Sequence, residues 1–229
     1  MGGFNFMIIV VPLLILLVIT WMIYNYYAGR LRRQELASWA ACNTLSFNPG
    51  SIRRMEEAYP AFECLHFGND RYASNLMVGK WSGRDFRAFD YHYTTGVGRS
   101  NEAHNFSAII LVSQVLLKPL LIRPENVLDH VAELFGDERI KFESAEFSRA
   151  FHVTSPDCKW AHDVLHPRAM EFLLSMPRFE IQFDGDNVMV HSHSDSSFSV
   201  QDFEAAAKVA QGLLDGLPEH VKEEEQAHA

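Results

Sequence analysis

The sequence predicts an α+β protein, in which a transmembrane helix near the N-terminus precedes a mostly antiparallel sheet with helices on one face. Residues 4–27 carry no charged side chain, which is typical of a membrane-spanning segment. Residues 71–95 hold two strand-like runs around a tight-turn sequence, which indicates a β-hairpin. The later helical patterns are grouped between strand patterns, and this order favours an antiparallel sheet.

The apolar segment from Phe4 to Tyr27 reads FNFMIIVVPLLILLVITWMIYNYY. A helix of this length covers about 36 Å at ~1.5 Å per residue, enough to cross a hydrocarbon core of ~30 Å with some tilt. A cleaved signal peptide and a buried core helix are the alternatives. The first is disfavoured because the residues before the segment include no cation and the apolar run is too long, and the second because core helices are rarely apolar on every face. We therefore expect contact with a lipid bilayer through residues 4–27.

The two flanks of this segment differ in charge and in aromatic content. Amphipathic rings, which prefer the headgroup level, gather at its C-terminal end: Trp21, Tyr24, Tyr26 and Tyr27. Three cations follow directly: Arg30, Arg32 and Arg33. Because positive residues stay on the cytoplasmic side, the sequence predicts a single-pass protein of the cell membrane, with its N-terminus outside and its soluble domain in the cytoplasm. The alternative interpretation of the arginines is a solvated helix face.

Composition narrows the classes of partner. The chain has 20 Lys and Arg against 29 Asp and Glu, a net charge of −9, which disfavours nucleic-acid binding because phosphate contacts need clustered cations. Its three cysteines have no C-x-x-C spacing, which fits a reducing compartment. Since no phosphate-binding loop or G-x-S-x-G sequence is present, the sequence predicts no cofactor.

The chain divides into four parts by composition and pattern. We expect a transmembrane anchor, a juxtamembrane helix with linker, a soluble α+β domain and an acidic flexible tail, at residues 1–29, 30–50, 51–217 and 218–229. The juxtamembrane part repeats apolar residues at helical spacing, so it should be a stalk that docks on the domain. Asn48-Pro49-Gly50-Ser51 ends it.

The soluble part starts with one or two short helices in residues 52–67 and continues with strands. The expected strands of the first half are 71–81, 85–95, 106–115 and 120–123, and a helix with its apolar stripe at 127–134 should follow Pro124. The second half predicts strands at 140–142, 150–154, 179–183 and 188–193, the last two forming a hairpin around 184–187. Ser155-Pro156 should open a helix that Pro167 breaks, followed by helices at 168–176 and 200–214.

Two groups of side chains are candidates for chemistry. Asp90 and His92 share a face of one predicted strand, and His191 and His193 share a face of another. If these strands met, the four residues would form an acid–base or metal cluster; the alternative is a solvated sheet face. His162 and His166 stand at i and i+4, the spacing of two zinc ligands on a helix, but Pro167 distorts that turn and no third ligand is evident. A polar helix face is the favoured interpretation of this pair, and no metal site is predicted.

Two short sequences, Phe89-Asp90-Tyr91 and Glu146-Phe147-Ser148-Arg149-Ala150-Phe151, carry a resemblance. The chain resembles uncharacterised prokaryotic membrane-anchored proteins that have one N-terminal helix and a compact soluble domain, over roughly residues 30–215. The resemblance implies the architecture and no activity. Residues 146–151 also fit a helix in which Phe147 and Phe151 pack together, an alternative to the strand at 150–154.

The absence of a coherent catalytic set favours one function class over another. We expect a membrane-tethered cytoplasmic interaction or ligand-binding domain whose partner is an unknown protein or small molecule. The alternative is a membrane-anchored hydrolase that uses the Asp90, His92, His191 and His193 cluster. Convergence of these side chains in a concave pocket would favour the enzyme.

Overall fold

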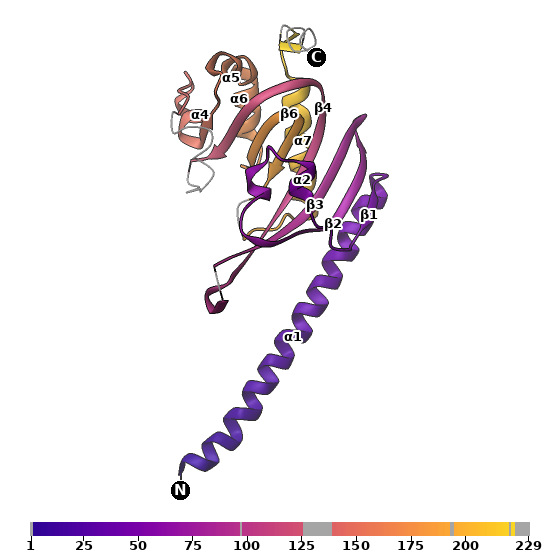
Figure 1. The fold of residues 1–229 in the computed structure, drawn as a ribbon, viewed down its shortest axis with the longest axis vertical. Coiled ribbons are helices and arrows are strands. Elements are labelled where there is room, and N and C mark those ends of the chain that lie inside the picture. Colours follow the sequence, from indigo (N-terminus) through magenta and orange to yellow (C-terminus); the bar gives the residue numbers. More distant parts are fainter. Residues whose placement is uncertain (1, 97, 126–138, 193–194, 220, 223–229) are drawn as a thin grey trace.

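The structure is a computed structural model that describes residues 2–96, 98–125, 139–192, 195–219 and 221–222. Figure 1 shows a long N-terminal helix, α1, that extends away from the folded part and joins it only through its C-terminal end. The folded part is a six-stranded antiparallel sheet with helices, so the predicted α+β class is confirmed. The sheet has the order β1-β2-β3-β4-β5, and β6 pairs with β4.

The first helix, α1 (Gly2–Cys42), passes without a break through the boundary expected at residue 29. Among the described residues it is the one helix long and apolar enough to cross a membrane, over Val10–Cys42, and none of its most apolar window is buried. Its last turns behave differently, because Leu36 and Ala40 are 1% and 0% exposed. The predicted docking stalk is therefore continuous with the apolar segment, and its end belongs to the domain core.

The predicted hairpin is present as β2 (Asn69–Trp81) and β3 (Arg84–Thr95). Its turn uses Gly83 at φ 84°, a backbone conformation that glycine adopts at little cost. The short strand β1 (Ser46–Asn48) pairs with the outer edge of β2. Two short helices fill residues 52–67 as expected: α2 (Met55–Ala58) and the 3₁₀ helix η1 (Glu63–Leu65).

The longest strand, β4 (Glu102–Pro124), replaces the two strands predicted at 106–115 and 120–123. The chain remains extended between the two predicted strands, and the irregularity there takes the form of register shifts between Val112 and Leu120. Figure 1 shows β4 as an arch over the top of the domain. A short 3₁₀ helix, η2 (Gly98–Ser100), lies in the connection from β3 to β4.

The strand β6 (Glu180–His191) follows this arch, antiparallel to β4. The hairpin predicted around 184–187 is wrong: residues 180–191 form the single strand β6, which bends at this place, with Gly185 at φ 57°, and pairs with β4 on both sides of the bend. Glu180 Oε2 and His191 Nε2 are consequently 3.9 Å apart. The ends of a straight strand of this length would be about 36 Å apart at ~3.3 Å per residue, so the strand folds back on itself.

The remaining elements are a short strand that pairs with β4 and the helices that pack on one face of the sheet. They are α4 (Ala145–Ala150), β5 (Phe151–Thr154), α5 (Cys158–Val164), α6 (Pro167–Ser175) and α7 (Val200–Asp215). The helical alternative for 146–151 holds as far as Ala150, and the strand begins at the next residue. Pro167 separates two helices as predicted.

Three expectations in this region were misplaced or cannot be compared. Asp157, rather than Ser155, caps α5 by accepting a hydrogen bond from the Trp160 N–H at 3.0 Å, while the Ser155 hydroxyl donates to the Pro119 carbonyl. Residues 140–142 form no strand, although the Ile140 N–H donates to Val153. The predicted helix at 127–134 lies outside the described residues.

The two faces of the sheet carry different cover. The larger core lies on one face and joins the end of α1 to α4, α5, α6 and α7, through residues such as Phe86, Ile109 and Phe203. The opposite face is covered by the segment that contains α2 and η1, around Phe62, Phe89 and Tyr91. The prediction of helices on one face is therefore confirmed for α4, α5, α6, α7 and the end of α1, whereas α2 and η1 cover the opposite face.

Candidate functional site

The junction between α1 and the sheet is built around a paired charge. Arg32 of α1 meets Asp90 of β3, with Nη2 2.7 Å from Oδ1 and Nε 3.1 Å from Oδ2. The side chains are 30% and 14% exposed, so this bidentate pair is largely shielded from water. Asp90 points toward the helix because it shares the core face of β3 with Phe86 and Ala88.

Three further residues complete what we call the Arg32 clamp, which consists of Arg32, Asp90, Asn75, Ser107 and Phe198. Asn75 Nδ2 donates to Asp90 Oδ2 at 2.8 Å, and the Ser107 hydroxyl donates to Asp90 Oδ1. Arg32 Nη1 donates to the Phe198 carbonyl at 2.8 Å, and the Phe198 N–H donates to Ser107 Oγ at 2.9 Å. The clamp thereby ties α1 to β2, β3, β4 and the segment before α7.

An apolar contact continues the junction along α1. Trp39 is 8% exposed and lies among three aromatic rings, with centroid distances of 5.9 Å to Phe203, 6.1 Å to Trp81 and 6.5 Å to Phe86. Aromatic pairs at these distances add to the free energy gained from burial alone. The helix that leaves the domain toward its N-terminus is thus held at two levels, by charge at Arg32 and by packing at Trp39.

A groove of about 580 Å³ lies between α1 and the start of α7, beside the clamp. We call it the α1–α7 groove. It is lined by Leu31, Gln34, Glu35, Ser38, Trp39, Cys42, Ser199, Val200 and Gln201. The α1 residues recur at helical spacing, so they form one stripe along the helix. Leu31, at the end closest to the apolar segment, is 59% exposed.

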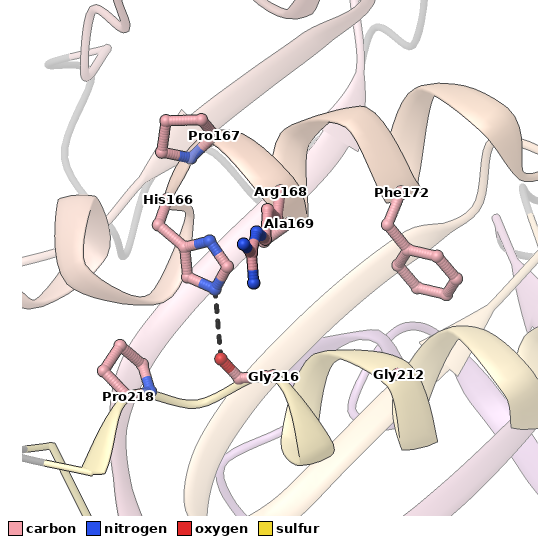
Figure 2. A pocket seen from close by; sticks show the side chains of 8 residues that line it. All are labelled: His166, Pro167, Arg168, Ala169, Phe172, Gly212, Gly216 and Pro218. Atoms are coloured by element: carbon pink, nitrogen blue, oxygen red, sulfur yellow. Dashed lines mark hydrogen bonds between the residues drawn. The ribbon is translucent and has the colours of Figure 1, made fainter.

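A second groove, of about 640 Å³, separates α6 from α7 (Figure 2). It is lined by His166, Pro167, Arg168, Ala169, Phe172, Gly212, Gly216 and Pro218. Figure 2 shows the His166 ring directed at the end of α7, where its Nε2 lies 3.0 Å from the Gly216 carbonyl oxygen. A Cβ atom at Gly212 would lie 2.6 Å from Phe172 Cζ, so glycine permits the close approach of the two helices.

The four candidate residues of the Asp/His cluster do not lie on one face. Asp90 and His92 are on the helix-covered face of β3, whereas His191 is opposite Ala108 and belongs to the other face. His193 lies outside the described residues. Asp90 forms an ion pair with Arg32, and His92 Nδ1 lies 2.9 Å from Asn105 Oδ1. Within the described part of the chain, no contact joins these residues into an acid–base set.

His162 and His166 also serve different contacts. His162 is in α5 and its ring centroid is 4.7 Å from that of Phe142, whereas His166 is the N-cap of α6. The helix that would have placed both imidazoles on one face ends at Val164, because of the following proline. No group of three or more metal-binding side chains occurs among the described residues.

Sequence reasoning identified Arg32 only as a topology signal and Asp90 only as a member of a hydrolytic cluster. The signal for their pairing was available in the strand alternation. Asp90 falls on the same face as Phe86 and Ala88, and a carboxylate on a core face requires a cation or several hydrogen-bond donors. Which of the chain's cations would supply this charge depends on tertiary packing, which the strand pattern does not contain.

Comparison with known proteins adds one likeness of fold. No protein-family model matches the sequence, and no curated protein matches it. Among solved structures, the chain is similar to the mycobacterial trehalose monomycolate transport factor A, with 15% sequence identity and a TM-score of 0.58. The match covers 81% of this chain and 96% of that chain. At this identity the likeness shows a shared fold.

Proposed function

We propose that this protein is a membrane-tethered, non-catalytic interaction domain, held by α1 in a fixed position at the cytoplasmic surface of the membrane. The observation that carries the proposal is the Arg32 clamp on an unbroken α1. A flexible linker would let a domain sample many orientations. Here the apolar segment and the core-packed turns belong to one helix, and charge and packing both fix that helix to the sheet.

The direction of insertion follows from the charges next to the apolar segment. Arg30 and Arg33 follow it directly, which favours a cytoplasmic domain and an external N-terminus. The cysteines agree with a reducing compartment, since the structure shows no disulfide among Cys42, Cys64 and Cys158. The fold shared with a protein described as a transport factor supports an assisting role in a membrane process, while the cargo named for that protein is not carried over.

The α1–α7 groove is the proposed place of interaction. Its stripe on α1 continues the surface of the membrane-crossing segment, so a helix that leaves the bilayer beside α1 would meet the groove without a change of direction. Leu31 and Trp39 supply apolar contact, and Glu35 supplies a negative charge for a basic partner residue. We therefore propose that the partner is a membrane protein with a basic, amphipathic juxtamembrane helix.

Topology is tested with the native thiols. Cys42 and Cys158 are exposed on the domain, so a thiol reagent that cannot cross membranes should label them only after the cells are permeabilised. Labelling of both in intact cells would contradict a cytoplasmic domain.

The interaction is tested by photocrosslinking in membranes. A photoreactive amino acid at Ser38 or Gln201, which line opposite walls of the groove, should give the same discrete adduct with one membrane protein. The matched control is Asp85, exposed at the start of β3, which should not give that adduct. The same product from all three positions, or different products from Ser38 and Gln201, would contradict a partner seated in the groove.

A further inference from the structure

The strand β3 runs alongside α1 in the opposite direction. Trp39 packs near Phe86, and Arg32 binds Asp90. Residue numbers therefore rise along β3 in the direction in which they fall along α1. Phe86 to Asp90 covers about 13 Å at ~3.3 Å per strand residue, and Trp39 to Arg32 covers about 10 Å at ~1.5 Å per helix residue. Over these contacts, β3 therefore runs beside α1 toward the N-terminal end of the helix.

The hairpin of β3 and β4 continues well past the clamp. Thr95 pairs with Glu102, and the path from Asp90 to Thr95 adds about 16 Å at ~3.3 Å per residue. The same distance along α1 spans about 11 residues at ~1.5 Å each, and it ends near Trp21. Figure 1 shows the connection between β3 and β4 projecting from the domain on the side of the N-terminus of α1. The tip thus reaches the level of the aromatic end of the apolar segment.

The tip has a composition that a headgroup layer tolerates. Gly96, at φ 89°, makes the turn tight, since a Cβ atom there would lie 2.1 Å from the Ser100 carbonyl oxygen. Gly96, Gly98, Ser100 and Asn101 are exposed. In the sequence, the charge between Thr95 and Glu102 is a single arginine, whose sign suits anionic lipid. Glu102 begins β4, on the domain side of the tip.

We propose that the β3–β4 tip, residues 95–96 and 98–102, is a second membrane contact, lying in the headgroup layer of the bilayer that α1 spans. The inference rests on the membrane tethering proposed above. Because α1 and the Arg32 clamp hold the tip at the bilayer, its effective concentration there is high and a weak intrinsic affinity is sufficient. Together, α1 and the tip fix the domain's tilt on the membrane, as well as its distance from it.

The test compares three single labels on the full-length chain in vesicles of phosphatidylcholine and phosphatidylglycerol. The background replaces Cys42, Cys64 and Cys158, and a polarity-sensitive fluorophore is attached at S100C, D85C or I15C. Ser100 is on the tip, Asp85 is exposed at the opposite end of β3, and Ile15 is exposed on the apolar segment. The Ser100 label should show blue-shifted emission and quenching by headgroup-labelled lipid. The Asp85 label should emit as in water and be quenched by iodide.

The Ile15 label separates the two ways in which the experiment can fail. If the Ile15 label reports hydrocarbon while the Ser100 label behaves like the Asp85 label, the tip contact is refuted and tethering stands. If the Ile15 label also reports water, tethering is refuted and the tip contact falls with it. In the variant R32A, the lipid-dependent signal of the Ser100 label should decrease while that of the Ile15 label is retained. An unchanged Ser100 signal in R32A would show that the clamp does not hold the tip at the bilayer, contrary to the proposal.

Discussion

Replacement of Arg32 by alanine should destabilise the folded domain far more than replacement of its neighbour Arg33. Arg32→Ala leaves the Asp90 carboxylate shielded, with Asn75 and Ser107 as its remaining donors among the described residues. Removing one partner of a buried ion pair costs about 3–5 kcal/mol. Because the side chains of Arg32 and Asp90 are 30% and 14% exposed, solvent screening reduces the expected loss to about 2–3 kcal/mol. For a chain of this size the melting temperature should fall by roughly 5–10 °C.

The assay is urea unfolding of the full-length chain in detergent, followed by tryptophan fluorescence. Arg33 is exposed, so Arg33→Ala is the matched control and should change the free energy of unfolding by less than about 0.5 kcal/mol. A cycle with Asp90→Ala should give a coupling energy of about 1–3 kcal/mol between the two positions. Equal effects of Arg32→Ala and Arg33→Ala, or a coupling energy near zero, would refute the clamp.

Three further predictions test the packing and the electrostatics. Trp39→Ala should cost about 3–5 kcal/mol in the same unfolding assay, and a loss below about 1 kcal/mol would mean that the end of α1 is not part of the core. The N–H of Trp160, followed by Lys118, lowers the pKa of Asp157, so its stabilisation is present above the unfolded pKa and lost as pH falls through the lower folded value. Asp157→Ala should therefore lower the free energy of unfolding by about 0.5–2 kcal/mol at neutral pH, and this loss should shrink below about pH 4. A loss that does not depend on pH would contradict the prediction. Burial, followed by the charge of Glu56, raises the pKa of Tyr91, so its phenol should not ionise near pH 10 in the folded protein, and stability should fall as pH rises above that value. A phenol absorbance change at 295 nm near pH 10 that Tyr91→Phe removes would contradict this.

The features predicted correctly from sequence are those that local patterns determine. The helix over residues 4–27, the hairpin around Gly83 and the break at Pro167 each depend on residues close together in the chain. Boundaries set by competing side chains were less predictable. Ser155 is an acceptable N-cap, but its hydroxyl bonds to Pro119, and Asp157 takes the cap.

The features missed depend on contacts between distant residues. The two strands predicted in β4 are one strand because β6 bends along with it and pairs with both parts. The residues around 112–120 do not reveal this pairing, since β6 lies far away in the sequence. Arg32 and Asp90 are 58 positions apart, and the position of Arg32 beside an apolar segment already had a sufficient explanation in membrane topology. A residue with one plausible role in the sequence can thus hold a second role that only the fold reveals.

A distance distribution tests most directly whether the folded domain is fixed to α1. Spin labels at Tyr27→Cys on α1 and Asp85→Cys on β3, both exposed, would be measured by double electron–electron resonance in lipid bilayers. A fixed domain predicts one narrow distance distribution, unchanged by Arg33→Ala and broadened by Arg32→Ala. A broad distribution in the otherwise native chain would contradict the account, because it would show that the domain moves freely on its anchor.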